Sequence, residues 1–337
     1  MDNTTLPCWN ENATCDNCER VLPENQTMIY TLTDSTVMGC AASIITVFGF
    51  LLNLLIILSL LSKKGVRQQI TSTHILSVLF ADLMCCTFNL PILSIRFLTR
   101  QSEFYLSKTL CTIFPIMFYV NLGAFVLSLM CVTINRTCIL YLQENATKYI
   151  KWKAQMVSVF LCWFLPVLAM ILPISGAYGE LGMNGYTQSC SIVEKDGKSP
   201  EKLLYNLFIF IPSLVMIICN VIIFIKLKRH SALRDPEAIR FILGILSVFL
   251  FFLVTLIPAW AVNYIDDCVQ YPQARTIAYI LVWTRTIFDP LVFLGMEESY
   301  RDAVRGFPKR LVKACKKKDE SEKRESAPMR LKTLRFT

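Results

Sequence analysis

Seven stretches of this 337-residue chain are apolar, and each is long enough to cross a lipid bilayer. Five contain no charged residue and two are interrupted by charges; they cover 35–62, 71–95, 109–135, 154–179, 203–225, 241–265 and 276–296. A hydrocarbon core of about 30 Å needs roughly 20 helical residues, and only helices or closed barrels satisfy their own backbone there. We therefore predict an all-α membrane protein with a seven-transmembrane helix bundle.

Composition leaves little chain outside these spans. Hydrophobic residues make up 54% of the sequence, and the mean hydropathy is +0.48. One integral membrane domain with no large soluble domain is expected. The predicted segments are a glycosylated extracellular N-terminal segment (1–34), the bundle (35–296), a short amphipathic eighth helix in the cytoplasm (297–315) and a basic disordered cytoplasmic tail (316–337).

Basic residues are concentrated in alternate connecting segments. With the N-terminus outside, the inner loops hold Lys63, Lys64, Arg67, Lys148, Lys151, Lys153, Lys226, Lys228, Arg229, Arg234 and Arg240. Short loops rich in Lys and Arg remain in the cytoplasm. This distribution predicts a multi-pass plasma-membrane protein with an extracellular N-terminus and a cytoplasmic C-terminus. The net charge of +9 then reflects topology and attraction to anionic membrane lipids, and no nucleic-acid partner is needed.

Three N-x-Ser/Thr sites in the N-terminal segment support this orientation. Asn3, Asn12 and Asn25 are expected to be glycosylated, because such sites are modified only on the lumenal side. A fourth site, at Asn145, falls on the predicted inner side and should be silent. No apolar signal-peptide core precedes residue 35, so the first helix is expected to act as its own insertion signal.

Six cysteines fall on the predicted outer side, where the compartment is oxidising: Cys8, Cys15, Cys18, Cys111, Cys190 and Cys268. Cys111 lies at the outer start of the third span and Cys190 in the loop between the fourth and fifth. A disulfide between these two would pin that loop over the mouth of the bundle. The other four allow three connectivities, among them a bond from the head to Cys268 or an internal Cys15–Cys18 bond.

Cys315 lies between an amphipathic stretch, 297–312, and the basic run Lys316, Lys317 and Lys318. This arrangement suits a palmitoylated helix on the inner leaflet. An unmodified thiol is the alternative.

One marker in each span, in order, carries a resemblance to a known family. The markers are Gly49 and Asn53, then Leu79, Phe80, Ala81 and Asp82, then Cys111, Asn135, Arg136 and Thr137, then Trp163, Pro212, Phe252 with Pro258, and Asp289 with Pro290. From residue 35 to 315 the chain resembles rhodopsin-like (class A) G-protein-coupled receptors. Leu90–Pro91 and Asn135–Arg136 are also similar to the invertebrate Moody and Trapped-in-endoderm receptors and their melatonin-like relatives.

The resemblance implies a switch at the inner end of the bundle. In the family, the cytoplasmic half of helix six swings outward about its proline, here Pro258, and opens a cavity for a heterotrimeric G protein; Phe252 would be the packing switch. An acidic residue normally restrains Arg136, but this chain has Asn135 before it and Thr137 after it. Loss of that charge should weaken the inactive state by roughly 1 kcal/mol or more, so raised basal activity is expected.

Asp82, Arg285 and Asp289 are charged residues at bilayer depth, where charges are costly and should face inward and pair. Arg285 and Asp289 are four residues apart on one helix face. The resemblance places both opposite Asp82, beside Asn53 and Asn121, in a cavity that holds a sodium ion in most relatives. We expect Arg285 to replace that ion, sharing its charge between two carboxylates of which one is protonated. Alternatively, Arg285 points up toward a ligand.

Other family switches are missing. Leu256 replaces the aromatic residue before the helix-six proline, Asn220 replaces the helix-five tyrosine, and Phe293 replaces the tyrosine that follows Asp289 and Pro290. Without the hydroxyls of these two tyrosines, the water-bridged hydrogen bond that stabilises the active state in relatives cannot form. An atypical or decoy receptor that binds ligand without activating G proteins is therefore the alternative function.

The resemblance predicts an apolar ligand pocket in the upper bundle. Its expected lining is Phe118, Tyr119, Leu204, Phe208, Trp260, Asn263, Tyr279 and Trp283. The third span lacks the aspartate of aminergic relatives, so the extracellular ligand is expected to be a lipid or a peptide. Arg96 and Arg100 could receive a carboxylate of a fatty acid or an acidic peptide terminus.

Two other classes are disfavoured. The two halves show no repeat of the kind found in transporters. An enzyme would need a metal cluster or an acid–base pair, but the only histidines are His74 and His230, both near the predicted cytoplasmic face. We expect no catalytic residue, cofactor or metal.

Overall fold

The computed structural model describes residues 30–63, 65, 72–100, 108–142, 152–184, 189–193, 200–229, 236–265 and 271–325. Several predicted features lie outside these residues: the glycosylation sites Asn3, Asn12 and Asn25, the sequon at Asn145, and the cysteines Cys8, Cys15, Cys18 and Cys268. The side chains of Asn263 and Cys315 also lie outside the described part, although their backbones are helical.

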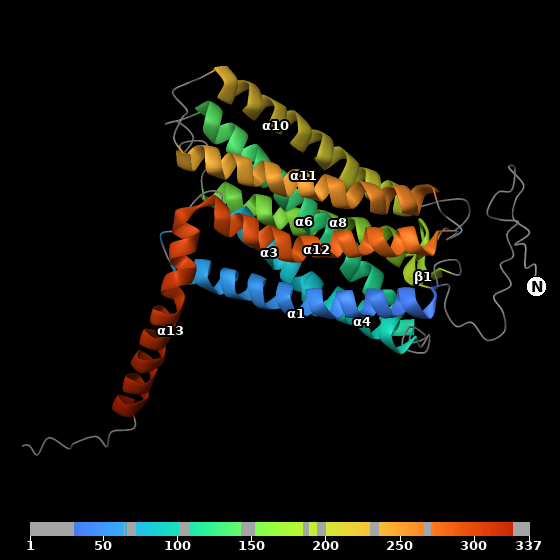
Figure 1. Ribbon diagram of the computed structural model, residues 1–337, viewed down its shortest axis with the longest axis horizontal. Coiled ribbons are helices and arrows are strands. Elements are labelled where there is room, and N and C mark those ends of the chain that lie inside the picture. Colours follow the sequence, from blue (N-terminus) through green and yellow to red (C-terminus); the bar gives the residue numbers. More distant parts are fainter. Residues whose placement is uncertain are drawn as a thin grey trace, which may run out of the picture.

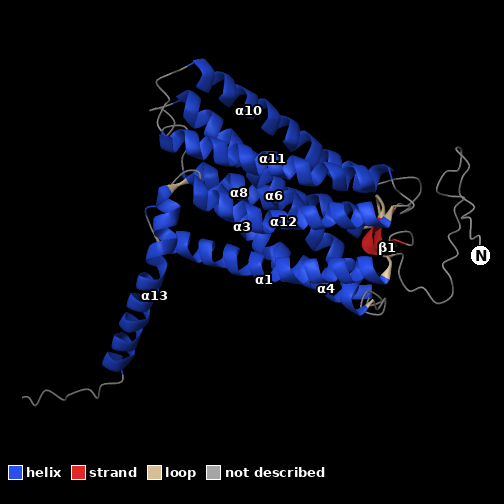
Figure 2. Ribbon diagram, in the orientation of Figure 1, coloured by secondary structure: helices blue, strands red, loops and turns tan. Residues whose placement is uncertain are grey.

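Within the described part, seven helical spans are long and apolar enough to cross a membrane, which confirms the predicted bundle. They run side by side in Figure 1, and apart from one β-hairpin the regular structure is helical (Figure 2). The spans are α1 (Leu32–Ser62); α3 (Ser72–Met84), η2 (Cys85–Asn89) and α4 (Leu90–Thr99); α6 (Lys108–Leu142); α8 (Trp152–Ile174); α9 (Pro200–Tyr205), η4 (Asn206–Phe210) and α10 (Ile211–Arg229); α11 (Pro236–Ile265); and α12 (Pro272–Met296).

The first helix begins earlier than the apolar run alone predicts. Thr31 caps α1, because its Oγ1 accepts a hydrogen bond of 3.1 Å from the backbone N–H of Asp34. Tyr30, just before the cap, is buried and packs its ring edge-on against Phe97 of α4 at 5.5 Å. The boundary predicted at residue 34 is therefore too late, since Tyr30 already belongs to the bundle.

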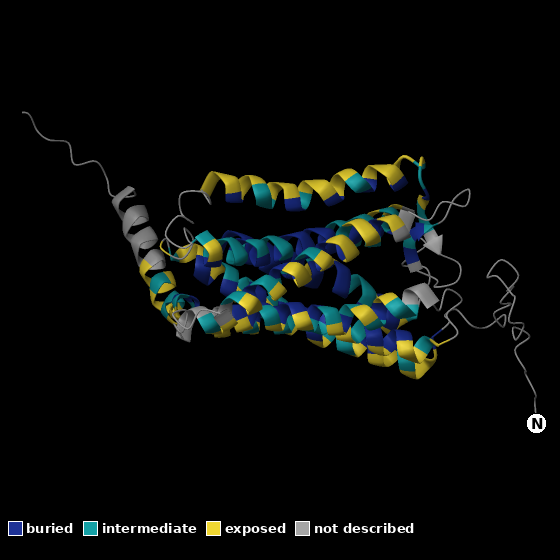
Figure 3. Cartoon of the chain, turned by 90° about the horizontal axis from the view of Figure 1, so that it is seen from above, coloured by how far each residue is buried: buried dark blue, intermediate teal, exposed yellow. Residues whose placement is uncertain are grey.

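The centre of the bundle is α6, the most buried of the seven spans. Buried and exposed positions alternate along the helices, as expected when one stripe of each helix faces its neighbours (Figure 3). Small residues allow close approach: a Cβ added at Gly123 of α6 would lie 2.8 Å from Cγ of Pro166 on α8. Large apolar side chains such as Phe160 and Phe224 are exposed on the outside, where lipid would cover them.

A short hairpin covers one end of the bundle. Strands β1 (Glu180–Asn184) and β2 (Ser189–Val193) pair antiparallel, with Met183 opposite Cys190. Cys190 forms a disulfide with Cys111 at the start of α6, with the two Cα atoms 5.0 Å apart. The predicted bond is confirmed, and we call this end of the molecule the hairpin end.

Helix α13 (Glu298–Glu325) leaves the opposite end, which we call the α13 end (Figure 1). It is longer than the predicted eighth helix, because residues 316–325 are helical where a disordered tail was expected. Their sequence explains the difference: it contains Lys and Glu, both good helix formers, with opposite charges at four-residue spacing and no Gly or Pro.

The start of α13 is fixed to the bundle by Tyr300. Its side chain is fully buried, and its hydroxyl lies 2.7 Å from Oγ of Ser72 at the start of α3. Burial raises the pKa of the Tyr300 hydroxyl above its ordinary value, so this group remains a neutral hydrogen-bonding partner. Nearby, Lys63 Nζ donates to the backbone carbonyl of Ser299 at 3.5 Å.

Candidate functional site

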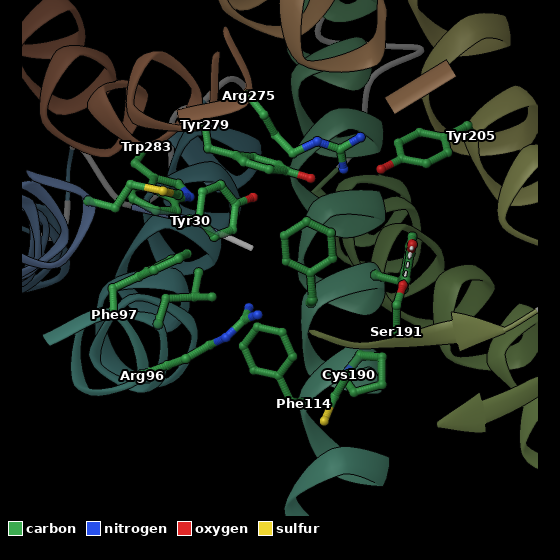
Figure 4. A pocket seen from close by; sticks show the side chains of 15 residues that line it. Tyr30, Arg96, Phe97, Phe114, Cys190, Ser191, Tyr205, Arg275, Tyr279 and Trp283 are labelled. Atoms are coloured by element: carbon green, nitrogen blue, oxygen red, sulfur yellow. Dashed lines mark hydrogen bonds between the residues drawn. The ribbon is translucent and has the colours of Figure 1, made fainter. Parts of the chain in front are cut away.

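A cavity of about 110 Å³ lies inside the bundle at the hairpin end (Figure 4). Aromatic residues dominate its wall, and two arginines contribute the positive charge. The lining comprises Tyr30, Met38, Leu93, Arg96, Phe97, Phe114, Pro115, Phe118, Tyr119, Cys190, Ser191, Tyr205, Arg275, Tyr279 and Trp283. The disulfide contributes directly, because Cys190 and the neighbouring Ser191 of β2 form part of the wall.

Five of the residues predicted for the pocket line this cavity: Arg96, Phe118, Tyr119, Tyr279 and Trp283. Leu204 and Phe208 do not. Leu204 is buried behind the wall in a cluster with Tyr119, Met170 and Ile192, and Phe208 packs against the same cluster. The π-helical turn η4 follows Tyr205, and such a turn changes the direction in which the next residues face relative to a regular α-helix.

The arginine beside Arg96 in the cavity is Arg275, and not Arg100 as the sequence suggested. Arg100 ends α4 with a left-handed φ of 53°, and its Nη2 donates to the backbone carbonyl of Tyr30 at 3.4 Å. Arg275 is in the first turn of α12 and is only 3% exposed; its Nη2 donates to the carbonyl of Val262 on α11 at 3.4 Å. Pro272 at the N-terminus of α12 was the available signal that Arg275 is helical.

A second, deeper chamber of about 50 Å³ adjoins the first. Five residues line both: Leu93, Phe118, Tyr205, Tyr279 and Trp283. The deeper wall also contains the predicted Trp260, together with Leu256 and Ala259, all on α11. These three residues lie on both sides of Pro258, so any occupant of the chamber contacts α11 around its internal proline.

Arg285 lies at the floor of the deeper chamber and forms an ion pair with Asp82. Its Nη1 is 2.7 Å from Asp82 Oδ1, and both side chains are buried. The guanidinium carbon also lies 3.7 Å from the ring centroid of Phe125 on α6. A buried arginine needs such partners, because an unpaired charge at bilayer depth is costly.

Asp289 does not share this ion pair, contrary to the expectation from its spacing. It is buried, and within the described part its Oδ2 has no hydrogen-bond partner. Asn53 Nδ2 donates to the carbonyls of Gly49 and Thr286, both at 2.8 Å, and so ties α1 to α12. Asn121 Oδ1 likewise has no partner among the described atoms. We call Asn53, Asp82, Asn121, Arg285 and Asp289 the polar core.

The polar core does not fit a sodium ion of the kind that the resemblance implies. A guanidinium already occupies one oxygen of Asp82 at hydrogen-bond distance. Asp82 Oδ2 and Asp289 Oδ2 have no hydrogen-bond partner in the described part, so two carboxyl groups face one arginine. The core is neutral without a further cation when one of the two carboxyl groups is protonated, as expected from the sequence. The polar core therefore contains its own cation, the side chain of Arg285 on α12.

A chain of contacts runs from this ion pair to α11. The guanidinium of Arg285 lies over the ring of Phe125. The centroid of that ring is 6.0 Å from the ring centroid of Phe252, and the two rings are tilted against each other. Phe252 is almost fully buried, one and a half turns from Pro258. The polar core and the predicted packing switch are thus connected through a single aromatic side chain.

Asn135 lies near the α13 end, and its side chain forms hydrogen bonds to neighbouring helices. Its Nδ2 donates to Oε1 of Gln155 on α8 at 2.7 Å and lies 3.3 Å from Nδ1 of His74 on α3. Thr137 donates to the carbonyl of Thr133 in its own helix. We call Asn135, Arg136, Thr137 and Phe293 the switch cluster.

Phe293 and Asn220 occupy positions where the family has tyrosines. Phe293 is fully buried in the main apolar core, beside Phe249 and Met296. Asn220 Nδ2 donates to the carbonyl of Met216 in its own helix at 2.9 Å. Neither side chain provides a hydroxyl group between α10 and α12.

Helices α11 and α12 meet closely at this end. Gly244 of α11 faces Met296, the last residue of α12, and a Cβ added at Gly244 would overlap with Met296 Cγ. Only glycine permits this contact. Sequence reasoning missed it, since a glycine in an apolar run gives no sign of its partner.

Comparison with known proteins decides the family. The family model "7 transmembrane receptor (rhodopsin family)" matches residues 52–293. The chain belongs to this family. The protein is therefore a membrane-spanning receptor and not an enzyme.

Two similar relatives in Drosophila melanogaster carry the names of the branch that the sequence motifs suggested. The receptor is 27% identical to Protein trapped in endoderm-1 over 307 residues, which cover 82% of this chain and 78% of that protein. It is 25% identical to the G-protein coupled receptor moody, covering 81% of this chain but only 50% of moody. The fold is similar to that of squid rhodopsin, with a TM-score of 0.71 at 17% identity over 89% of this chain and 93% of the other.

Proposed function

We propose that this receptor binds a non-aminergic extracellular ligand, a lipid or a peptide, in the cavity at the hairpin end and couples it to heterotrimeric G proteins at the α13 end. One observation carries the proposal. Residues of α11 on both sides of Pro258 line the deeper chamber. Phe252 on the same helix packs against Phe125, and the ring of Phe125 lies under the guanidinium of Arg285. A ligand in the chamber can therefore bias the position of α11.

The charge of the cavity argues against an amine. Among the described residues that line the upper cavity there are two arginines and no carboxylate. An ammonium ligand would meet like charge in a buried site, and that repulsion is costly at low dielectric. An uncharged or acidic ligand fits the lining better.

The proposal places the hairpin end outside the cell at the plasma membrane. The Cys111–Cys190 disulfide supports this, since such bonds persist in oxidising compartments. The basic residues of α13, including Lys309, Arg310 and Lys313, support a cytoplasmic position for the other end. An epitope tag at the N-terminus should be accessible to antibody on intact cells, whereas a C-terminal tag should require permeabilisation.

Raised basal activity is part of the proposal. Asn135 carries no charge, and its hydrogen bonds go to Gln155 and His74 on neighbouring helices. The side chain that precedes Arg136 therefore contributes to interhelical packing and supplies no ionic restraint. The inactive state then depends on other contacts at this end, among them the packing of Gly244 against Met296 and the attraction between Arg136 and the charge of Glu297.

A second candidate, a receptor that binds ligand without activating G proteins, is favoured by Phe293 and Asn220. Phe293 is sealed in the apolar core and Asn220 bonds to its own helix, so neither can form the hydroxyl bridge that the family resemblance predicts for the active state.

Guanine-nucleotide exchange on a panel of purified heterotrimeric G proteins separates the two candidates. The receptor should be reconstituted in nanodiscs without added ligand, and Arg136→Ala is the control. Exchange above the receptor-free rate that falls in Arg136→Ala supports coupling. The absence of exchange with every G-protein class would contradict the proposal and support the second candidate.

A further inference from the structure

We propose that the cavity binds an acidic amphiphile, a lipid with one anionic head group and one alkyl chain, with the head between Arg96 and Arg275 and the chain in the deeper chamber. This assignment rests on the proposed position of the cavity on the outer side, and it deepens the proposed function by naming the ligand class.

The head-group site is defined by two buried arginines from different spans. Arg96 on α4 is 4% exposed and Arg275 on α12 is 3% exposed, and both line the upper cavity. Figure 4 shows their guanidinium groups reaching the cavity from two sides, separated by aromatic rings. Guanidinium groups bind carboxylate and phosphate in a planar, often bidentate geometry, and these bonds strengthen where water is excluded.

The position of Arg285 fixes the orientation of the ligand. Arg285 is the arginine of the deeper chamber, but its charge is already paired with Asp82 at 2.7 Å. No carboxylate lines the upper cavity among the described residues. The upper cavity therefore presents two arginine side chains to an anionic head, whereas the floor presents one that a carboxylate already neutralises.

The passage between the two chambers suits an alkyl chain. The residues common to both walls are Leu93, Phe118, Tyr205, Tyr279 and Trp283, four of them aromatic. Tyr279 and Trp283 are stacked, with ring centroids 6.3 Å apart. An alkyl chain that lies against flat apolar surfaces of this kind is stabilised because water is excluded from both.

The size of the cavity favours a lipid over a peptide. Its two chambers measure about 110 and 50 Å³, well below the roughly 300–1,000 Å³ usual for drug-sized ligands. A single chain can follow a narrow, bent passage, whereas a peptide terminus must also accommodate side chains and satisfy its backbone amides. The deeper wall is rich in apolar side chains, including Leu256, Ala259 and Trp260.

Direct binding to the full-length receptor in nanodiscs tests the assignment without any G protein. The probe is tritiated dodecanoic acid, and the competitors share its chain but differ in head group: dodecyl phosphate, dodecan-1-ol and dodecylammonium. We expect saturable binding that dodecanoate or dodecyl phosphate displaces and that the alcohol and ammonium compounds displace at least about tenfold more weakly, as expected for charge-assisted bonds. The better acidic competitor identifies the head group as carboxylate or phosphate.

Matched arginine variants locate the head. Arg96→Gln and Arg275→Gln should each weaken binding of the better acidic probe about tenfold or more. Arg100→Gln should leave it unchanged, because Arg100 is not among the residues that line the cavity. Cell-surface amount and melting temperature show that each variant is folded. Equal binding in all three variants, or equal displacement by the alcohol, would show partition into the bilayer and overturn the assignment.

An overpacking variant locates the chain. Ala259→Val adds volume to the wall of the deeper chamber and should weaken binding of dodecanoate more than that of hexanoate, which is too short to fill it. Equal effects on both acids would place the chain elsewhere and contradict the proposal.

Displacement by acetylated trileucine with no displacement by any alkyl acid would assign the cavity to a peptide instead. Saturable acid binding with no nucleotide exchange would support this inference while contradicting G-protein coupling.

Discussion

The polar core and the switch cluster carry opposite departures from what the family resemblance predicts. At mid-membrane, where the resemblance implies an aspartate and neutral residues around a sodium ion, this receptor has an ion pair between Arg285 and Asp82. At the α13 end, where relatives have a charged restraint, it has the neutral amide of Asn135 bonded to Gln155. We infer that the positive charge which replaces the ion lies at the centre of this bundle, whereas the residue before Arg136 contributes only neutral hydrogen bonds.

The largest expected effect comes from breaking the central ion pair. Arg285→Met leaves Asp82 buried without a counter-charge, which should cost about 3–5 kcal/mol of stability in sodium-free buffer. The melting temperature of the purified receptor measures this. The control is the double variant Arg285→Met with Asp82→Asn, which should recover most of the loss. A single variant as stable as the unaltered receptor would show that the pair contributes little.

A smaller effect is expected where α11 and α12 meet. Gly244→Val places side-chain atoms in the space of Met296, which should cost about 1–3 kcal/mol and displace the α13 end of α11. Basal nucleotide exchange should therefore rise. Combining Gly244→Ala with Met296→Ala makes room for the new methyl group and serves as the control. If Gly244→Val changes neither melting temperature nor exchange, packing at this contact does not hold the inactive state.

Restoring a charge to the switch cluster should have a modest effect of opposite sign. Asn135→Asp gives the guanidinium of Arg136 an acidic neighbour in its own helix, in addition to Glu297, and should favour the inactive state by about 1 kcal/mol. Basal exchange should then fall a few-fold. Asn135→Leu, which removes the amide without adding charge, should not lower it. Unchanged output in Asn135→Asp would remove the support for raised basal activity.

The smallest effect is expected from Phe293→Tyr alone. The new hydroxyl enters a fully buried apolar site, and Asn220 on α10 offers no hydroxyl for a water bridge. Nucleotide exchange should change little. The double variant Phe293→Tyr with Asn220→Tyr restores both groups and should raise exchange at saturating ligand. A large rise from the single variant would mean that the switch cluster already contains a partner for it.

Sequence alone predicted the features that bilayer physics dictates. The seven spans follow from the length of the apolar runs, and the cost of charge at that depth predicts that Arg285 is paired. That Asp82 is its partner was implied by the family resemblance. The exclusion of Asp289 was not predictable, because four-residue spacing fixes a helix face but not which carboxylate a guanidinium reaches.

Pocket residues were predicted less well, for two physical reasons. Leu204 precedes the π-turn η4 and Phe208 lies within it, and hydropathy does not reveal that turn in a uniformly apolar helix. Tyr30 and Arg275 lie at helix ends, where boundaries are uncertain by a residue or two from sequence.

The length of α13 was also not predicted. It depends on the helix propensity of the charged residues at its end, and these residues show no hydrophobic periodicity from which a helix could be predicted.

The central claim is that Arg285 takes the place of a mobile cation. Its most direct test is the melting temperature of the purified receptor in sodium chloride and in choline chloride at equal ionic strength, for the unaltered chain and for Arg285→Asn. We predict no difference between the two salts for the unaltered receptor, and stabilisation by sodium in Arg285→Asn, where Asp82 is freed. Marked stabilisation of the unaltered receptor by sodium would contradict the account.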